Sequence, residues 1–192
     1  GEKTLSEVKS LGREAILIQA DVAQEEDVKR MVEQASKQFG GIDVLVNNAG
    51  IVWDIPIFTK TVEQWERTLS VNLIGAYLCT KYVVPLMIKN GGGSIINNSS
   101  VAGFIGCPNT VAYCTSKGAV MQFTRSLALD HVKEGIRVNT ICPGFIKTKM
   151  NEDFIGNPPD AQKQLDVMAA QIVPMGKRGE PIDIAYGVLY LA

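Results

Sequence analysis

The chain has 192 residues, of which 46% are hydrophobic and 20% are charged, a balance that excludes an intrinsically disordered protein and suits one globular domain. The formal net charge of -1 gives no general attraction to nucleic acid or to an anionic membrane, so we expect neither as a partner. We also expect no apolar run long enough to span a bilayer, and the polar start Gly1–Ser10 is unlike a signal peptide.

The cysteines do not have the spacing of a metal site. They are Cys79, Cys107, Cys114 and Cys142; none forms a C-x-x-C pair, and His131 is the single histidine. Structural zinc sites need several such ligands, so we expect no metal. Reduced thiols of a cytoplasmic protein are the simplest interpretation.

Segments with strand and helix patterns alternate along the chain. In chain order we predict a helix end at Thr4–Leu11, a strand at Ala15–Gln19, a helix at Glu25–Phe39, a strand at Asp43–Asn47, a long helix at Glu63–Ile88 with a kink near Pro85, a strand at Ser94–Ser99, a helix at Ala112–Val132, a strand at Arg137–Cys142 and a helix at Ile182–Ala192.

This alternation predicts an α/β fold of the Rossmann type, a doubly wound parallel sheet with helices on both faces. Residues 1–192 form one such domain. The first and last helices are incomplete, and no glycine-rich turn joins a strand to a helix. We therefore expect the sequence to be an internal part of a longer chain.

Tyr113 and Lys117 are the first candidates for chemistry. Four residues apart on a helix, they share one face. A tyrosine hydroxyl has a pKa near ~10, and an adjacent ammonium lowers it, so the pair could act as a general acid and base. The spacing alone is weak evidence, because it recurs in ordinary helices.

Ligand-type residues follow successive predicted strands, where a parallel sheet presents its binding edge. Ser100 could hydrogen-bond a substrate oxygen or cap the next turn. The small residues of Asn47–Gly50 would let a flat ligand approach, or form a simple turn. Asp21 could bind an adenine amine or cap the helix from Glu25. Asn72, a poor helix former, could hold a water or a backbone carbonyl.

Six motifs in this order resemble the single-domain short-chain dehydrogenases/reductases over essentially the whole chain, and Ser100 precedes Tyr113 by the 13 positions of the family pattern. The motifs are Asp21-Val22, Val46-Asn47-Asn48-Ala49-Gly50, Asn72 in Val-Asn-Leu-Ile-Gly, Ser99-Ser100-Val101-Ala102-Gly103, Tyr113-Cys114-Thr115-Ser116-Lys117-Gly118, and Arg137-Val138-Asn139 followed by Pro143-Gly144-Phe145-Ile146-Lys147-Thr148.

The resemblance implies a role for each matching residue and NAD or NADP as cofactor. The catalytic residues would be Tyr113 as proton donor or acceptor, Lys117 lowering its pKa and binding the nicotinamide ribose, Ser100 orienting the substrate, and Asn72 holding a water in a proton relay. The remaining cofactor contacts would be Asp21 and Val22 at adenine, Asn48 and Gly50 at the adjoining ribose, and Ile146 and Thr148 at the carboxamide.

The sequence departs from the family pattern in two places. The glycine-rich phosphate turn and the second strand, which separates NAD from NADP enzymes, have no match here. Asn98 stands where relatives carry an apolar residue, and a polar side chain in a central strand needs a partner.

The predicted function is hydride transfer between NAD(P) and a secondary alcohol, ketone or sugar. A loop over Met150–Met168 would act as a mobile lid and set the substrate, and Trp53, Phe58 and Phe104 could line its pocket or belong to the core. His131 suits the end of a helix rather than catalysis.

Three alternatives remain open. A 3-oxoacyl thioester (acyl-carrier-protein) reductase is less favoured, because no arginine occupies the places of Asn90–Gly91 and Glu134. An epimerase or dehydratase of the extended branch would carry a larger carboxyl-terminal domain, and a non-catalytic scaffold would have lost a catalytic residue.

A homo-oligomer, either a dimer or a tetramer, is also predicted. The helix Glu63–Ile88 has an apolar surface too wide for covering one sheet face, and Ala112–Val132 carries the small residues Ala112, Cys114, Gly118 and Ala119. The alternative is that these positions only form the core of one chain.

Overall fold

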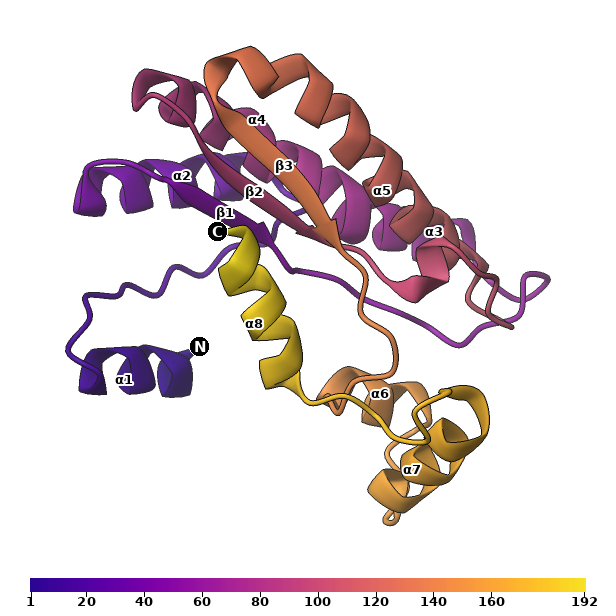
Figure 1. Ribbon diagram of the computed structural model, residues 1–192. Helices are drawn as coiled ribbons and strands as arrows, with labels where there is room; N and C mark the ends of the chain where they lie inside the picture. Colours follow the sequence, from indigo (N-terminus) through magenta and orange to yellow (C-terminus); the bar gives the residue numbers. More distant parts are fainter.

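A three-stranded parallel sheet forms the centre of the computed structural model, which describes all of residues 1–192 (Figure 1). Strands β1 (Val44–Asn47), β2 (Gly93–Asn98) and β3 (Ile136–Ile141) lie in the order β1-β2-β3. Asn47 is in register with Asn97, and Asn98 with Ile141. Since the strands run in the same direction, their carboxyl ends meet at one edge, as predicted.

Helices cover both faces of this sheet. Helices α4 (Gly75–Lys89) and α5 (Val111–His131) pack on one face, with α2 (Glu25–Phe39) against α4, while α8 (Pro181–Leu191) crosses the other (Figure 1). The core lies between the first face and its helices, and its fully buried residues include Val28, Met87 and Ile95. The predicted α/β class and doubly wound arrangement are confirmed.

The long predicted helix is interrupted, but not at the proline. Helix α3 (Val62–Leu69) continues into a π-helical segment, η1 (Ser70–Ile74), and then into α4, which extends four residues past Pro85. A π turn inside an α-helix often marks a functional position. Here it contains Asn72.

The prediction that no apolar segment is long enough to span a membrane is wrong. Val62–Lys89 is long and apolar enough to cross a membrane by length and composition alone. More than half of its most apolar window, 56%, is buried within the protein, where it faces β1, β2 and α2. Its hydrophobicity is therefore that of a core helix.

The predicted strand Ala15–Gln19 is wrong. The segment runs between α1 (Glu2–Ser10) and α2 without a backbone hydrogen bond to any strand, and Ile16 and Leu17 are exposed. Its apolar composition suits a strand, but a strand exists only where a neighbour pairs with it. No strand pairs with this segment.

The predicted loop Met150–Met168 is also wrong, because it contains two helices, α6 (Lys149–Phe154) and α7 (Ala161–Ile172). Ala161, Leu165 and Ala169 form a buried stripe with a spacing of four residues. Behind α7, the buried Arg178 guanidinium donates to Asp166 Oδ1 (2.9 Å) and to Gln162 Oε1 (2.7 Å). Short 3-10 turns at Val101–Gly103 (η2) and Val132–Glu134 (η3) complete the fold.

A buried polar chain joins the sheet to α5. Asn47 Nδ2 donates to Asn97 Oδ1 (2.8 Å), and Asn97 Nδ2 donates to Thr124 Oγ1 (2.8 Å). Asn97 is fully buried, so an unpaired amide there would keep the full cost of its desolvation. The chain therefore fixes the register of β1 on β2 and the position of α5.

We predict that Asn97→Ala lowers the free energy of unfolding by roughly 2–4 kcal/mol, because it removes a buried side chain together with its hydrogen bonds to Asn47 and Thr124. Asn139→Ala is the control, since Asn139 lies on β3 and its side chain makes no hydrogen bond. Its cost should stay below about 1 kcal/mol. Urea denaturation of both variants measures the difference, and equal losses would contradict the role of this chain.

Candidate active site

A cavity of about 560 Å³ lies at the carboxyl ends of the strands. Its walls come from the ends of β1 and β2, from α5, from the segment between β3 and α6, and from α8. Seven of the residues predicted for catalysis or cofactor binding line it, namely Asn48, Gly50, Ser100, Tyr113, Lys117, Ile146 and Thr148. The edge of a parallel sheet thus brings together residues up to 100 positions apart.

Lys117 is almost completely buried, with 4% of its surface exposed. Its Nζ donates to the backbone oxygen of Asn98 (2.7 Å) and lies 5.6 Å from the centroid of the Tyr113 ring. Burial disfavours the charged form and lowers the pKa of Lys117 from 10.5 to about 8. The ammonium has three donors, and Asn98 is the only acceptor that the protein gives it.

The expected lowering of the Tyr113 pKa is not found. Burial of the hydroxyl raises the pKa of Tyr113, and interaction with the Ser100 side chain opposes this in part. Lys117 does not contribute, because its pKa lies below that of Tyr113 and the ammonium has lost its proton before the tyrosine ionises. Desolvation of both groups outweighs their mutual attraction in this structure.

Ser100 combines the two interpretations offered for it. It precedes η2 in an extended conformation, and its Oγ accepts a hydrogen bond from Ala102 N (3.1 Å). The same side chain lines the cavity beside Tyr113. Capping the turn therefore holds the hydroxyl at the cavity wall.

Asn72 connects elements around the cavity but does not line it. Its Nδ2 donates to Ile51 O (2.9 Å) and Ser116 Oγ (3.0 Å), and its Oδ1 accepts from Ile51 N (2.8 Å). A Cβ added at Gly50 would lie 3.5 Å from both Asn72 Oδ1 and Lys117 Nζ. Asn72 thus holds a backbone carbonyl, as one prediction proposed, and Gly50 keeps the space before Lys117 free.

Asn98 has the partner that the sequence did not reveal. Its Nδ2 donates to Asn48 Oδ1 (2.7 Å), so the two amides pair across the ends of β1 and β2. Its Oδ1 is buried without a hydrogen bond. The partner was not visible in the sequence because it lies 50 residues away, just past the end of another strand.

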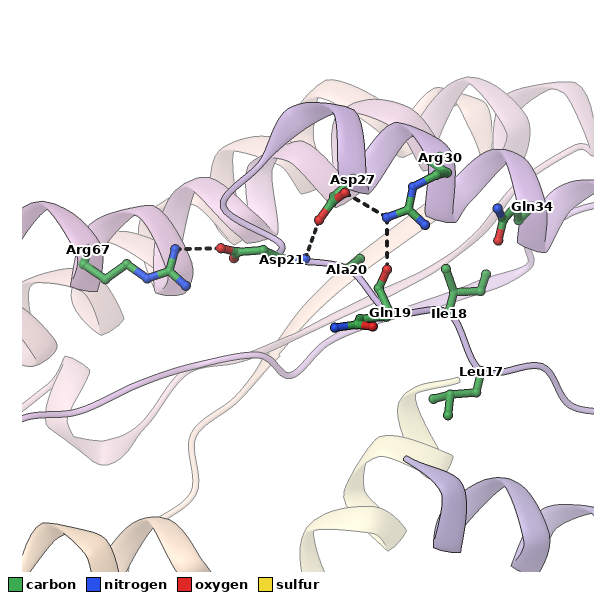
Figure 2. Close-up of a pocket in the computed structure, with 9 residues that line it drawn as sticks. All are labelled: Leu17, Ile18, Gln19, Ala20, Asp21, Asp27, Arg30, Gln34 and Arg67. Atoms are coloured by element: carbon green, nitrogen blue, oxygen red, sulfur yellow. Dashed lines mark hydrogen bonds and ion pairs between the residues drawn. The ribbon is translucent and has the colours of Figure 1, made fainter.

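Asp21 and Val22 are not brought to this cavity. Asp21 lies in a separate groove of about 700 Å³ between the segment before α2 and the α2 helix (Figure 2). Its carboxylate accepts from Arg67 Nη1 (2.9 Å) and Ala23 N (3.0 Å), and the hydrogen bond from Arg67 is the main reason why the pKa of Asp21 is lowered. Val22 packs against Gly75.

The same groove holds a second arginine. Arg30 donates to Asp27 Oδ1 (2.8 Å) and to the backbone oxygen of Gln19 (3.0 Å), as Figure 2 shows. Both arginines are therefore already paired with acceptors of the chain itself.

A second cavity of about 570 Å³ adjoins the first, with which it shares Gly50 and Met150. Trp53, for which cavity and core were both open, lines it, whereas Phe58 and Phe104 line neither cavity and, at 86% and 65% exposed, do not belong to the core. Its other wall is α6, with Asp153 and Phe154. Both residues belong to the segment Met150–Met168 that was expected to set the substrate, although as a loop and not as a helix.

His131 lies away from these cavities at the end of α5, where its Nδ1 is 3.9 Å from Glu134 Oε2. This agrees with the position at a helix end that the sequence predicted.

Comparison with known proteins gives one family. The family profile described as short chain dehydrogenase matches residues 1–157. The 3-oxoacyl-[acyl-carrier-protein] reductase of Synechocystis is 36% identical over 191 residues, which cover 100% of this chain and 73% of the relative.

Two solved structures share the fold along nearly the whole chain. NAD+-bound xylitol dehydrogenase superposes with a TM-score of 0.91 at 34% identity, covering 99% of this chain and 77% of its own. The gluconate 5-dehydrogenase of Burkholderia cenocepacia, in complex with NADP and tartrate, gives 0.89 at 27% identity, covering 99% and 72%. The chain thus spans about three quarters of the length of these proteins.

The lowered pKa of Lys117 predicts how stability depends on pH. Between about pH 8 and pH 10.5 the unfolded chain holds a proton that the folded chain has lost, so stability rises with pH in this window. Measured against Lys117→Met, the unfolding free energy of the wild type should rise by roughly 2 kcal/mol from about pH 7 to about pH 9.5.

Lys81→Met is the matched control, because the ion pair with Glu25 raises the pKa of Lys81. Its contribution should be the same at about pH 7 and about pH 9.5, because both lie below the 10.5 of the unfolded chain, and it is lost only at higher pH. Chemical denaturation at the two pH values tests both, and a wild-type advantage over Lys117→Met that does not change with pH would disprove the burial argument.

Proposed function

The chain belongs to the short-chain dehydrogenase/reductase family, and from this premise we propose that its first cavity transfers a hydride between NAD(P) and a secondary alcohol, ketone or sugar carbon. One observation carries this proposal: Ser100, Tyr113 and Lys117, from two separate elements, line the same cavity. A scaffold of the same fold would not need all three. We therefore favour the enzyme over the scaffold.

The residues around Lys117 fit a nicotinamide nucleotide. Two of the three ammonium donors remain for ribose hydroxyls, and the missing side chain at Gly50 leaves room for them. Asn48, Ile146 and Thr148 would complete the wall around the ring, which supplies or accepts the hydride. Asp21 and Val22 would contact adenine beyond this cavity. The hydrogen bond from Arg67 would hold Asp21 in place for this contact.

In this proposal Tyr113 is the general acid and base. Its hydroxyl gives a proton to the carbonyl oxygen during reduction and takes it back during oxidation, while Ser100 donates a hydrogen bond to the same oxygen. Asn72 would be a positioning residue, because its side chain fixes Ile51 and Ser116 beside the cavity. Its backbone would bind a water of the proton relay.

The substrate would lie in the second cavity, between Trp53 and α6. Its only charged lining residues are Asp54 and Asp153, which favours an uncharged polyol or sugar. The Synechocystis relative supports a 3-oxoacyl thioester reductase as the second candidate, but no arginine occupies the places of Asn90–Gly91 and Glu134. NAD and NADP both remain candidate cofactors.

A homo-oligomer built on α4 and α5 is a further part of the proposal. Many apolar residues of α4, including Ala76 and Val84, are buried within the single chain. The support for an interface is therefore limited to the exposed apolar residues of this region, which are Ile74, Tyr77, Ile88, Val111 and Leu129. The four free thiols support a cytoplasmic enzyme.

Tyr113→Phe should reduce turnover by roughly a thousandfold or more while the fold persists, because the ring still packs but the proton donor is gone. Tyr82→Phe is the control, since the Tyr82 hydroxyl bonds Glu25 on the surface. Steady-state oxidation of xylitol with NAD and NADP, together with circular dichroism, provides the test. Turnover within a few-fold of the wild type would refute the role of Tyr113.

Sedimentation at micromolar concentration should give a dimer or tetramer for the wild type. Tyr77→Glu should shift it toward the monomer, because a carboxylate would be buried at the contact. Phe39→Glu, at the exposed end of α2, should leave the mass unchanged. A fully active monomeric wild type would show that these apolar residues are not an interface.

A further inference from the structure

Two cysteines flank the Tyr113 site, and a tight turn folds one toward the other. Pro108 and Asn109 form the centre of the turn, and Asn109 has a φ of 57°, the left-handed value that such turns require. At its end Thr110 donates to the backbone oxygen of Cys107 from both N (3.4 Å) and Oγ1 (2.9 Å). Cys107 is thereby held over the start of α5.

Cys114 lies on the first turn of α5, four residues after Thr110. Its backbone N donates to Thr110 O (2.9 Å), and its Sγ lies 3.4 Å from Thr110 Oγ1. The Thr110 hydroxyl thus touches both cysteine residues. The two thiols also interact with each other. Burial is the main reason why the pKa of Cys107 is raised, and the charge and the hydrogen bond of Cys114 raise it further.

This thiol pair is coupled to both cavities. The charges of both thiols act on the Tyr113 hydroxyl and contribute to its raised pKa. The turn itself is tied to the second cavity, because Ile55 N donates to the backbone oxygen of Asn109 (3.0 Å). A movement of the turn would therefore change the surroundings of the Tyr113 hydroxyl and the wall of the second cavity together.

We propose that Cys107 and Cys114 form a reversible disulfide that switches off the Tyr113 site. Neither the predicted catalytic set nor the proposed mechanism uses these thiols. The effect on turnover rests on the proposed function, whereas formation of the bond does not. Catalytic or redox-sensing disulfides of this kind are the ones that occur in reducing compartments.

The oxidant would be a small-molecule disulfide. One cysteine, as thiolate, attacks a sulfur of the oxidant and releases its other half as a thiol. The second cysteine, as thiolate, then displaces the remaining half, so that two protein thiols lose two protons and two electrons and the oxidant becomes two thiols. The sulfurs must approach to about 2 Å, which draws the Cys107 turn onto the start of α5.

The test incubates the protein with oxidised glutathione, a linear small-molecule disulfide, at about pH 8.5, near the usual pKa of a thiol. Trypsin leaves Cys107 and Cys114 in one peptide, residues 90–117, without another cysteine. We expect this peptide to lose two hydrogen atoms and the number of free thiols to fall from four to two. Turnover should fall roughly tenfold to a hundredfold and return on reduction, because the reacting groups are displaced.

Matched variants separate the possible causes. Cys107→Ser and Cys114→Ser should each abolish both the mass change and the loss of turnover, whereas Cys142→Ser, which keeps the pair, should retain both responses. An unchanged 90–117 peptide, or a turnover loss that persists in both serine variants, would overturn the proposal.

A protein without any turnover in its reduced form would refute the proposed function and not the disulfide. In that event the peptide mass still reports the bond, and amide hydrogen exchange reports the switch. Altered exchange in residues 104–114 on oxidation would support a coupled rearrangement, and unchanged exchange would overturn it.

Discussion

The buried ammonium group of Lys117 determines how the rest of the site is built. A buried cation needs an acceptor, and the carboxyl end of β2 supplies one in the backbone oxygen of Asn98. This contact exists only because α5 lies close to that end: Ser99 Oγ donates to Lys117 O (2.7 Å), and a Cβ at Gly103 would come within 3.0 Å of the same oxygen. The cavity is thus the outcome of packing a helix tightly onto the end of a strand.

The amino-acid sequence predicted what depends on local periodicity and on strand ends. The helix Glu25–Phe39 has its predicted bounds, and Tyr113 and Lys117 share a face because a helix fixes their spacing. Ser100 could be placed because parallel strands end at a common edge. The segment Ala15–Gln19 failed for the opposite reason, since strand pairing depends on a neighbour that its own composition does not reveal.

Features set by long-range contacts were beyond the sequence. The partner of Asn98 lies 50 residues away. The buried stripe of α7 could not be predicted as part of a helix, because its packing depends on Arg178, which is buried against α7. The electrostatics of the Tyr113 and Lys117 pair also depend on depth of burial. Sequence spacing shows that two groups are adjacent, but it does not show how much water remains around them, and in this structure desolvation dominates both.

The π-helical segment around Asn72 has a consequence for how this chain tolerates change in length. A π turn contains one residue more than an α turn, so Ser70–Ile74 stores a single-residue insertion inside an otherwise continuous helix. Losing one codon here would restore regular α-helix and leave α3 and α4 in their present phase, because it removes only the extra residue, but it would also remove the bulge that presents Asn72. Asn72 would then leave Ile51 and Ser116, although no side chain had been replaced. In-frame deletions should therefore be far less tolerated at this segment than in the loop around Gly156.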